Sequence, residues 1–228
     1  MYADRTARIA TTAYLIVGGA WAWLSGQPGP AWLETAWFAT VAAAGAFLPG
    51  PANQVSLARA YLAAPVLVYS LHNEFGAVAV CVALAALTDL VDGTIARRLA
   101  TPSNLGGGLD PVVDGLFMGA LSVGLAFGGV FPLWLALVVI ARYLLPAAAG
   151  AVLIAVHRRP ELRHTLTGQV STTLILILLG GVCLFRALNQ DASGLVAAAV
   201  VVIPVATAAT YVHLAWVSRR PVAAPAPG

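Results

Sequence analysis

The sequence predicts an all-α integral membrane protein, and two observations carry that prediction. Of the 228 residues, 60% are hydrophobic and only 9% are charged, and the mean hydropathy is +0.87. A soluble domain carries about 25% charged residues, so too few are present here to cover the surface of a globule in water. Apolar segments close to the length of a membrane-spanning helix, roughly 20 residues, also recur along the whole chain.

Eight apolar segments are expected to form helices, because short polar or Gly/Pro-rich breaks separate them. The first break reads Gly-Gln-Pro-Gly-Pro, which is a turn sequence and not a small-residue cleavage site, so no cleavable signal peptide is expected. The Pro/Ala-rich tail at 221–228 is expected to be disordered. The expected helices are residues 7–25, 32–48, 55–71, 76–99, 109–127, 131–156, 168–185 and 195–217.

The arginines predict how these helices are oriented in the membrane. If the N-terminus lies inside, one side receives ten arginines and the other only Arg186, accompanied by Asp191. Both termini and the acidic motif described next are therefore expected on the cytoplasmic side of a cell inner membrane. The arginines form no continuous stripe, so nucleic acid is not expected as a partner. The ten are Arg5, Arg8, Arg59, Arg97, Arg98, Arg158, Arg159, Arg163, Arg219 and Arg220.

Four of the nine acidic residues lie close together at Asp89, Asp92, Asp110 and Asp114. Carboxylates in or near a bilayer usually mark a site. The first two share one face of the helix expected at 76–99, and the last two are spaced i, i+4 on the next helix. The break between these helices is rich in turn formers, so a hairpin would bring the four carboxylates together. All-oxygen ligation suits Mg²⁺ or Mn²⁺, and two such ions are expected.

Three further residues share the face of Asp89 and Asp92. Gly93 and Ala96 remove side-chain bulk, so that an extended ligand can approach the backbone, and Arg97 offers a fork that matches phosphate. Together these features predict a site for a pyrophosphate-bearing ligand that bridges two metals during in-line displacement at phosphorus. The alternative is a structural network of acids and arginine that only holds two helices together.

At these residues the sequence resembles the CDP-alcohol phosphotransferase family of integral membrane enzymes. The family signature is D-x-x-D-G-x-x-A-R, eight residues, then G-x-x-x-D-x-x-x-D. The stretch at 51–59, Pro-Ala-Asn-Gln-Val-Ser-Leu-Ala-Arg, also resembles the opening of the family's first core helix. The resemblance implies a six-helix catalytic core at 51–220, preceded by two additional transmembrane helices at 1–50. The matching positions are Asp89, Asp92, Gly93, Ala96, Arg97, Gly106, Asp110 and Asp114.

The resemblance implies a reaction and a role for each matching residue. Asp89, Asp92 and Asp110 would ligate the metals, and Asp114 would be both a ligand and the general base for the acceptor hydroxyl. The alkoxide would attack the β-phosphorus of a CDP-linked lipid, most often CDP-diacylglycerol, and CMP would leave. Members of the family form homodimers, so the resemblance is compatible with a homodimer of this chain. The residues expected to contact the CDP moiety are Asn53, Gln54, Gly93, Ala96, Arg97 and Ser103.

The acceptor alcohol is less well defined by the sequence. Arg142 lies within an apolar segment, where a charge costs a few kcal/mol, and this favours binding of an anionic acceptor or donor phosphate over simple pairing with a carbonyl. Many relatives that use glycerol 3-phosphate carry Lys directly after the last motif aspartate and after a later glycine, whereas this chain has Gly115 and Gln169. Glycerol 3-phosphate and phosphatidylglycerol are the leading acceptors, while inositol phosphate and an uncharged alcohol stay open.

Two non-enzymatic functions compete with the transferase. In a membrane cation transporter, the acids would form part of an ion path. In a non-catalytic nucleotide-lipid-binding protein, the same residues would bind the CDP-lipid without turnover. The transporter is disfavoured because the carboxylates gather at one end of the bundle, and the non-catalytic protein is disfavoured because the set of acids is complete.

Overall fold

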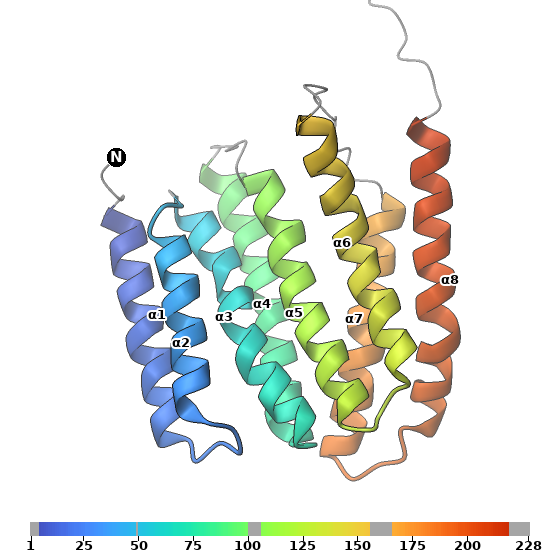
Figure 1. Cartoon of the computed structure of the whole chain (residues 1–228), viewed down its shortest axis with the longest axis horizontal. Coiled ribbons are helices and arrows are strands. Elements are labelled where there is room, and N and C mark those ends of the chain that lie inside the picture. The colour runs from blue at the N-terminus through green and yellow to red at the C-terminus, as the bar shows by residue number, and fades with distance from the viewer. Residues whose placement is uncertain (1–4, 49, 100–105, 156–165, 219–228) are drawn as a thin grey trace, which may run out of the picture.

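The computed structural model describes residues 5–48, 50–99, 106–155 and 166–218. Within these ranges the chain forms eight α-helices and no strand, which confirms the predicted all-α fold (Figure 1). The helices are α1 (Arg5–Leu24), α2 (Ala31–Gly45), α3 (Pro51–Leu71), α4 (Phe75–Leu99), α5 (Gly106–Phe127), α6 (Leu133–Ala155), α7 (Leu166–Ala187) and α8 (Ser193–Ser218). The tail at 221–228 lies outside the described residues.

Helix α3 begins at Pro51, whereas the sequence predicts a start at residue 55. Proline suits the first helical position, because its missing N–H has no partner to lose there. Gly50 precedes it with a φ of 93°, a conformation that favours glycine. Asn53 and Gln54 consequently lie in the first turn of α3 and not in the break before it.

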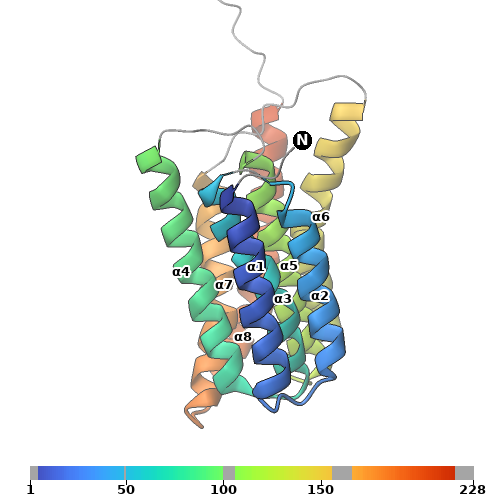
Figure 2. The same cartoon turned by 90° about the vertical axis from the view of Figure 1, so that its left-hand side faces the viewer.

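The helices run alternately up and down in one bundle (Figure 1). Helices α1, α3, α5 and α7 begin at the end that is uppermost in Figure 1, and the other four helices end there. Figure 2 shows the same bundle from the side, with α1 nearest the viewer. The end of α4 and the start of α5, which carry the acidic motif, therefore lie at this end of the bundle, called the motif end below.

The buried apolar residues fall into two clusters. The larger one is formed by α3 to α8 and includes Val66, Leu121 and Leu179, none of which is more than 1% exposed. The smaller one joins α1 and α2 to the outer face of α3 and includes Phe38 and Tyr61. The two N-terminal helices thus pack on α3, which in turn contributes to the larger core.

Helices α3 and α5 approach each other closely because glycines line their crossing. A Cβ atom on Gly124 would lie 2.5 Å from the Ser70 Cβ atom and 3.0 Å from the Leu67 carbonyl oxygen. A Cβ atom on Gly128 would lie 2.5 Å from the Ser70 carbonyl oxygen. This crossing lies at the end of the bundle opposite the motif end, and it fixes α3 against the helix that carries Asp110 and Asp114.

Among the described residues, three helical segments are long and apolar enough to cross a membrane: Leu109–Phe127, Val170–Ala187 and Ser193–His213. Two shorter apolar segments, Phe75–Val91 and Leu133–Pro146, accompany them. Large apolar side chains such as those on α8 are exposed on the outside of the bundle. These features suit a membrane protein, while the number of spans and their orientation stay predictions.

Candidate functional site

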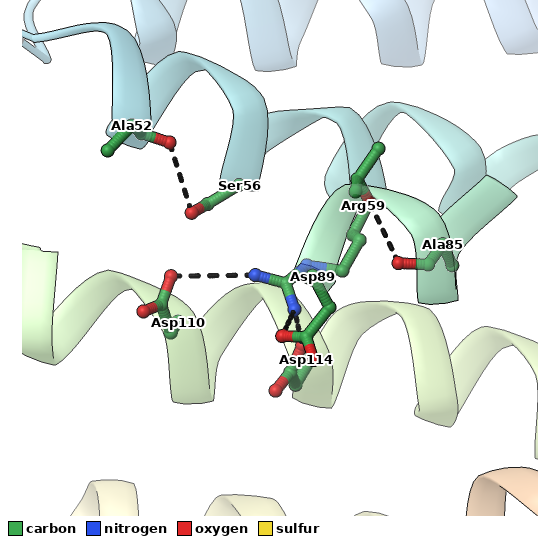
Figure 3. Close-up of polar contacts among 8 residues, drawn as sticks. Ala52, Ser56, Arg59, Ala85, Asp89, Asp110 and Asp114 are labelled. Carbon is green, nitrogen blue, oxygen red and sulfur yellow. Dashed lines mark hydrogen bonds and ion pairs between the residues drawn. The ribbon is translucent and has the colours of Figure 1, made fainter. Parts of the chain in front are cut away.

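Three aspartates of the motif converge on one buried arginine at the motif end (Figure 3). The Arg59 side chain on α3 is only 4% exposed. Its Nη1 atom lies 2.5 Å from Oδ1 of Asp89 on α4 and 2.9 Å from Oδ1 of Asp114 on α5. Its Nη2 atom lies 3.5 Å from Oδ1 of Asp110, one helical turn before Asp114. Side chains from three helices therefore meet at one positive charge.

The three carboxylates differ in how far they are open to the surroundings. The exposed fraction of the side chain falls from 67% for Asp89 to 47% for Asp110 and 28% for Asp114. The cluster is thus partly accessible, and Asp114 is its most enclosed member.

The remaining motif residues lie in or next to the same hairpin. Asp92, Gly93, Ala96 and Arg97 belong to α4, but their side chains lie outside the described part of the structure. Ser103 falls in 100–105, which also lies outside it. Asp92 follows Asp89 by three residues on a helix, so the two share a face. The contacts predicted for these residues stay predictions.

The sequence interpretation missed the central position of Arg59. The sequence pattern places Arg59 among the arginines of the inner side and at the end of the matching stretch at 51–59, and it assigns Arg59 no role in the site. The available signal was a charged residue within an apolar helix, because a buried charge needs partners. Its partners could not be read from spacing, since they come from α4 and α5.

Gln54 and Asn53 are buried in the first turn of α3, with exposed fractions of 3% and 5%. The Gln54 Nε2 atom donates hydrogen bonds to the carbonyl oxygens of Gly45, at 2.9 Å, and Leu48, at 2.8 Å. The Tyr14 hydroxyl donates to the Gln54 carbonyl oxygen at 3.0 Å. These bonds of Gln54 join α3 to α1 and to the end of α2, and its predicted contact with CDP stays a prediction.

Arg142 on α6 is 7% exposed and sits among neutral oxygen atoms of α7 and α8. Its guanidinium donates to the Gly168 carbonyl oxygen at 3.0 Å and to three hydroxyl groups. The Arg142 Nε–H is buried and has no hydrogen-bond partner among the described residues. Arg142 thus pairs with a carbonyl oxygen and also keeps one N–H donor that no described residue satisfies. The hydroxyls belong to Ser171 at 2.5 Å, Thr172 at 3.1 Å and Thr210 at 3.2 Å.

The carboxylates fit a hard divalent cation in donor type. Carboxylate oxygen is the ligand that Mg²⁺ and Mn²⁺ prefer. In the arrangement of the described residues the carboxylates face Arg59, and no three of them surround a common point as metal ligands do. Asp92, the fourth predicted ligand, lies outside that description. To bind metal ions, the carboxylates would therefore have to coordinate the ions while they also contact Arg59.

Residues 51–216 match the model of the CDP-alcohol phosphatidyltransferase family. The matched region starts at the first residue of α3 and ends within α8. It therefore contains Arg59, the three convergent aspartates and Arg142.

Several curated relatives are similar to parts of the chain. A probable cardiolipin synthase (CMP-forming) of Drosophila melanogaster is 30% identical over 144 residues, which are 56% of this chain and 45% of the relative. The cardiolipin synthase (CMP-forming) of Homo sapiens is 41% identical over 99 residues, 42% of this chain and 33% of the relative. That of Streptomyces coelicolor is 45% identical over 60 residues, 26% of this chain and 28% of the relative.

The matches thus span less than half the length of each of these relatives. No solved structure is similar to the chain at a comparable level of significance.

Proposed function

The chain belongs to the CDP-alcohol phosphatidyltransferase family, and we propose that it transfers a phosphatidyl group from CDP-diacylglycerol to phosphatidylglycerol, forming cardiolipin and releasing CMP. It is a phosphatidyltransferase by family and by its similarity to CMP-forming enzymes. The acceptor is proposed because each relative described above is named as a cardiolipin synthase. The observation that carries the proposal is the convergence of Asp89, Asp110 and Asp114 on one cationic centre.

Asp114 is proposed as the general base. It is the least exposed of the three carboxylates, and so it is the one that an acceptor hydroxyl can meet away from bulk water. Arg59 holds Asp114 next to Asp89 and offsets the repulsion among the acids, because a guanidinium can contact several carboxylate oxygens in fixed geometry. Protonation of Asp114 would leave an alkoxide able to attack the β-phosphorus of the CDP-lipid.

The acids are proposed to hold two divalent ions, Mg²⁺ or Mn²⁺, through Asp89, Asp92, Asp110 and Asp114. Divalent metals are general in this family, and when bound they supply neutralisation of the pyrophosphate charge and a better leaving group. Gly93 and Ala96 would leave room for the CDP moiety on the face of α4. Arg97, Ser103, Asn53 and Gln54 are the proposed polar contacts of CDP.

Arg142 is proposed to bind the phosphate of the acceptor. A charge in an apolar helix is costly, and the described contacts of Arg142 are with neutral oxygens and leave its charge without a carboxylate. An anionic ligand would supply the missing partner. The motif end and both termini are proposed to face the cytoplasm from a cell inner membrane, with the enzyme acting as a homodimer.

The proposal is tested with the purified protein in mixed micelles that contain CDP-diacylglycerol, phosphatidylglycerol and Mg²⁺ or Mn²⁺. Release of CMP and formation of cardiolipin, both followed by mass spectrometry, are expected, and a chelator should stop both. Glycerol 3-phosphate, inositol phosphate and glycerol serve as competing acceptors in parallel. If no acceptor causes release of CMP, the transferase proposal is wrong; if another acceptor is preferred, the assignment to cardiolipin is wrong.

A further inference from the structure

Tyr143 on α6 packs directly against the residue that follows the proposed base. A Cβ atom on Gly115 would lie 2.9 Å from the Cβ atom of Tyr143 and 3.3 Å from its Cγ atom. A side chain at position 115 would therefore require Tyr143 to move. The glycine after Asp114 thus leaves room for an aromatic residue of the neighbouring helix, which packs on the backbone beside the proposed base.

The hydroxyl of Tyr143 is buried and makes no hydrogen bond of normal geometry with any described residue, although Thr172 and Arg142 lie near it. A buried donor without a partner is unfavourable unless a ligand or water satisfies it. The charged groups near enough to act on this hydroxyl are Asp114 and Arg142, and Thr172 lies beside it. The hydroxyl is therefore within electrostatic reach of both the proposed base and the proposed phosphate-binding arginine.

Arg142 offers a second unmet donor next to the first. The carbon of its guanidinium lies 5.9 Å from the centre of the Tyr143 ring, and its buried Nε–H has no partner within the described part of the chain. Its other nitrogens are held by oxygens of α7 and α8, so the orientation of the group is fixed. One full positive charge and one neutral hydroxyl therefore lie side by side, both able to donate to an anionic oxygen.

This pair of donors matches a phosphodiester better than a phosphomonoester. A phosphodiester carries one negative charge, whereas a phosphomonoester carries close to two at neutral pH. A cation at position 115 could compensate a second charge, but Tyr143 fills that space. Tyr143 packs on the residue that follows Asp114, and Asp114 is proposed to act on the acceptor hydroxyl, so the phosphate assigned to these donors is that of the acceptor and not that of the CDP-lipid.

We propose that Tyr143 is a specificity-determining residue, which binds the acceptor's phosphate together with Arg142 and, through its contact with Gly115, selects a glycerol phosphodiester over a glycerol phosphomonoester. This inference rests on the proposed transferase function. It names the acceptor class as a lipid with a single negative phosphate and a free glycerol hydroxyl. The acceptor hydroxyl would then reach Asp114 while its phosphate contacts Tyr143 and Arg142.

The test compares Tyr143→Phe with a matched control, Tyr61→Phe. Both changes remove only a buried hydroxyl that has no described hydrogen-bond partner, and the ring that packs on Gly115 is kept. Tyr61 lies in the smaller core cluster, where it stacks on Tyr14. Tyr143→Phe is expected to raise KM for phosphatidylglycerol about tenfold or more, in line with loss of a hydrogen bond to a charged group. KM for CDP-diacylglycerol and kcat should stay within about twofold, and Tyr61→Phe should change none of them.

Two further measurements separate this inference from the transferase proposal. Binding of short-chain phosphatidylglycerol to the protein is measured by calorimetry, without CDP-lipid, and should weaken about tenfold in Tyr143→Phe. In the wild type, kcat/KM for phosphatidylglycerol should exceed that for glycerol 3-phosphate. Equal binding and equal KM in the wild type and Tyr143→Phe, or a preference for glycerol 3-phosphate, would overturn the inference even if CMP is released. Weakened binding without CMP release by the wild type would uphold the phosphate site and reject the transferase.

Discussion

Arg59 determines how the acidic site behaves before any ligand arrives. Three carboxylates lie within 3.5 Å of its guanidinium, and like charges at such distances repel one another unless a cation lies among them. The arginine is buried, while the acids are partly exposed. The positive charge is therefore fixed by the fold, and the acids remain accessible to metals.

Replacement of Arg59 by Gln should lower stability and increase the effect of metals. The carboxylates would lose their common counter-ion, at a cost of about 1–3 kcal/mol, reduced by the partial exposure of the acids. Mg²⁺ should then raise the Tm of Arg59→Gln more than that of the wild type, because it replaces the missing charge. The check is thermal unfolding in detergent with and without Mg²⁺. An equal rise in both proteins would show that Arg59 and the metal do not share carboxylates.

Replacement of Asp114 by Asn should abolish most turnover while the fold is kept. Loss of a general base lowers kcat by about 10²- to 10⁴-fold, and Asn has nearly the same size as Asp. The check is kcat for CMP release, with the Tm measured on the same sample. Asp191→Asn is the control, because Asp191 is an exposed acid in the loop before α8. Full activity in Asp114→Asn would exclude it as the base.

The residues of this site were predictable to different degrees. Asp110 and Asp114 share a helix, so their proximity follows from i, i+4 spacing, and Asp89 joins them once the hairpin is assumed. Arg59 and Tyr143 could not be placed in this way, because each meets its partners across a contact between helices. Spacing in one segment carries no information on which side chain of another segment lies opposite.

The crossing of α3 and α5 connects packing to the site, since these helices carry Arg59 and two of its partners. Gly124→Ala should therefore destabilise the protein. The added Cβ atom would lie 2.5 Å from Ser70, and overpacking costs about 1–3 kcal/mol. Gly119→Ala on the same helix is the matched control, because its Cβ atom would meet only Ile140, at 3.8 Å. Thermal unfolding of the two variants is the check, and a Gly124→Ala protein as stable as Gly119→Ala would contradict the tight crossing.

The contacts of Gln54 make its two roles separable. If its amide mainly joins α3 to α2, Gln54→Met removes the side-chain donor to the carbonyls of Gly45 and Leu48. The Gly45 carbonyl keeps the bond from the Leu48 N–H, and loss of the amide lowers stability by about 1–3 kcal/mol. KM for CDP-diacylglycerol would then stay unchanged. If Gln54 contacts CDP as the family resemblance implies, KM rises instead. The described bonds favour the first result, and a rise in KM at unchanged Tm would decide for the second.

At the scale of the whole molecule, the sequence predicts where the helices lie along the chain, but it does not predict which helices pack against each other. Long apolar segments between turn sequences define each helix, because hydropathy and breakers are local properties. Which helices touch is decided by shape, such as the glycines of α5 at Ser70 and the Trp37 indole that donates to the Ala60 carbonyl oxygen at 2.8 Å. The packing of α1 and α2 on α3 was for that reason not derivable from the pattern.

The orientation of the bundle is a prediction from the arginines, and it can be measured in sealed inner-membrane vesicles of known sidedness. Single cysteines are introduced at Arg5, which is exposed at the motif end, and at Gln190, which is exposed at the other end. The native Cys81 and Cys183 are buried and are replaced by Ala to remove background. A membrane-impermeant maleimide should label Arg5→Cys from the cytoplasmic side and Gln190→Cys from the opposite side, because positive residues are retained inside. The reverse pattern would place the acidic site away from the cytoplasm and its supply of CDP-lipid precursors, and the proposed reaction could then not be assigned to this face.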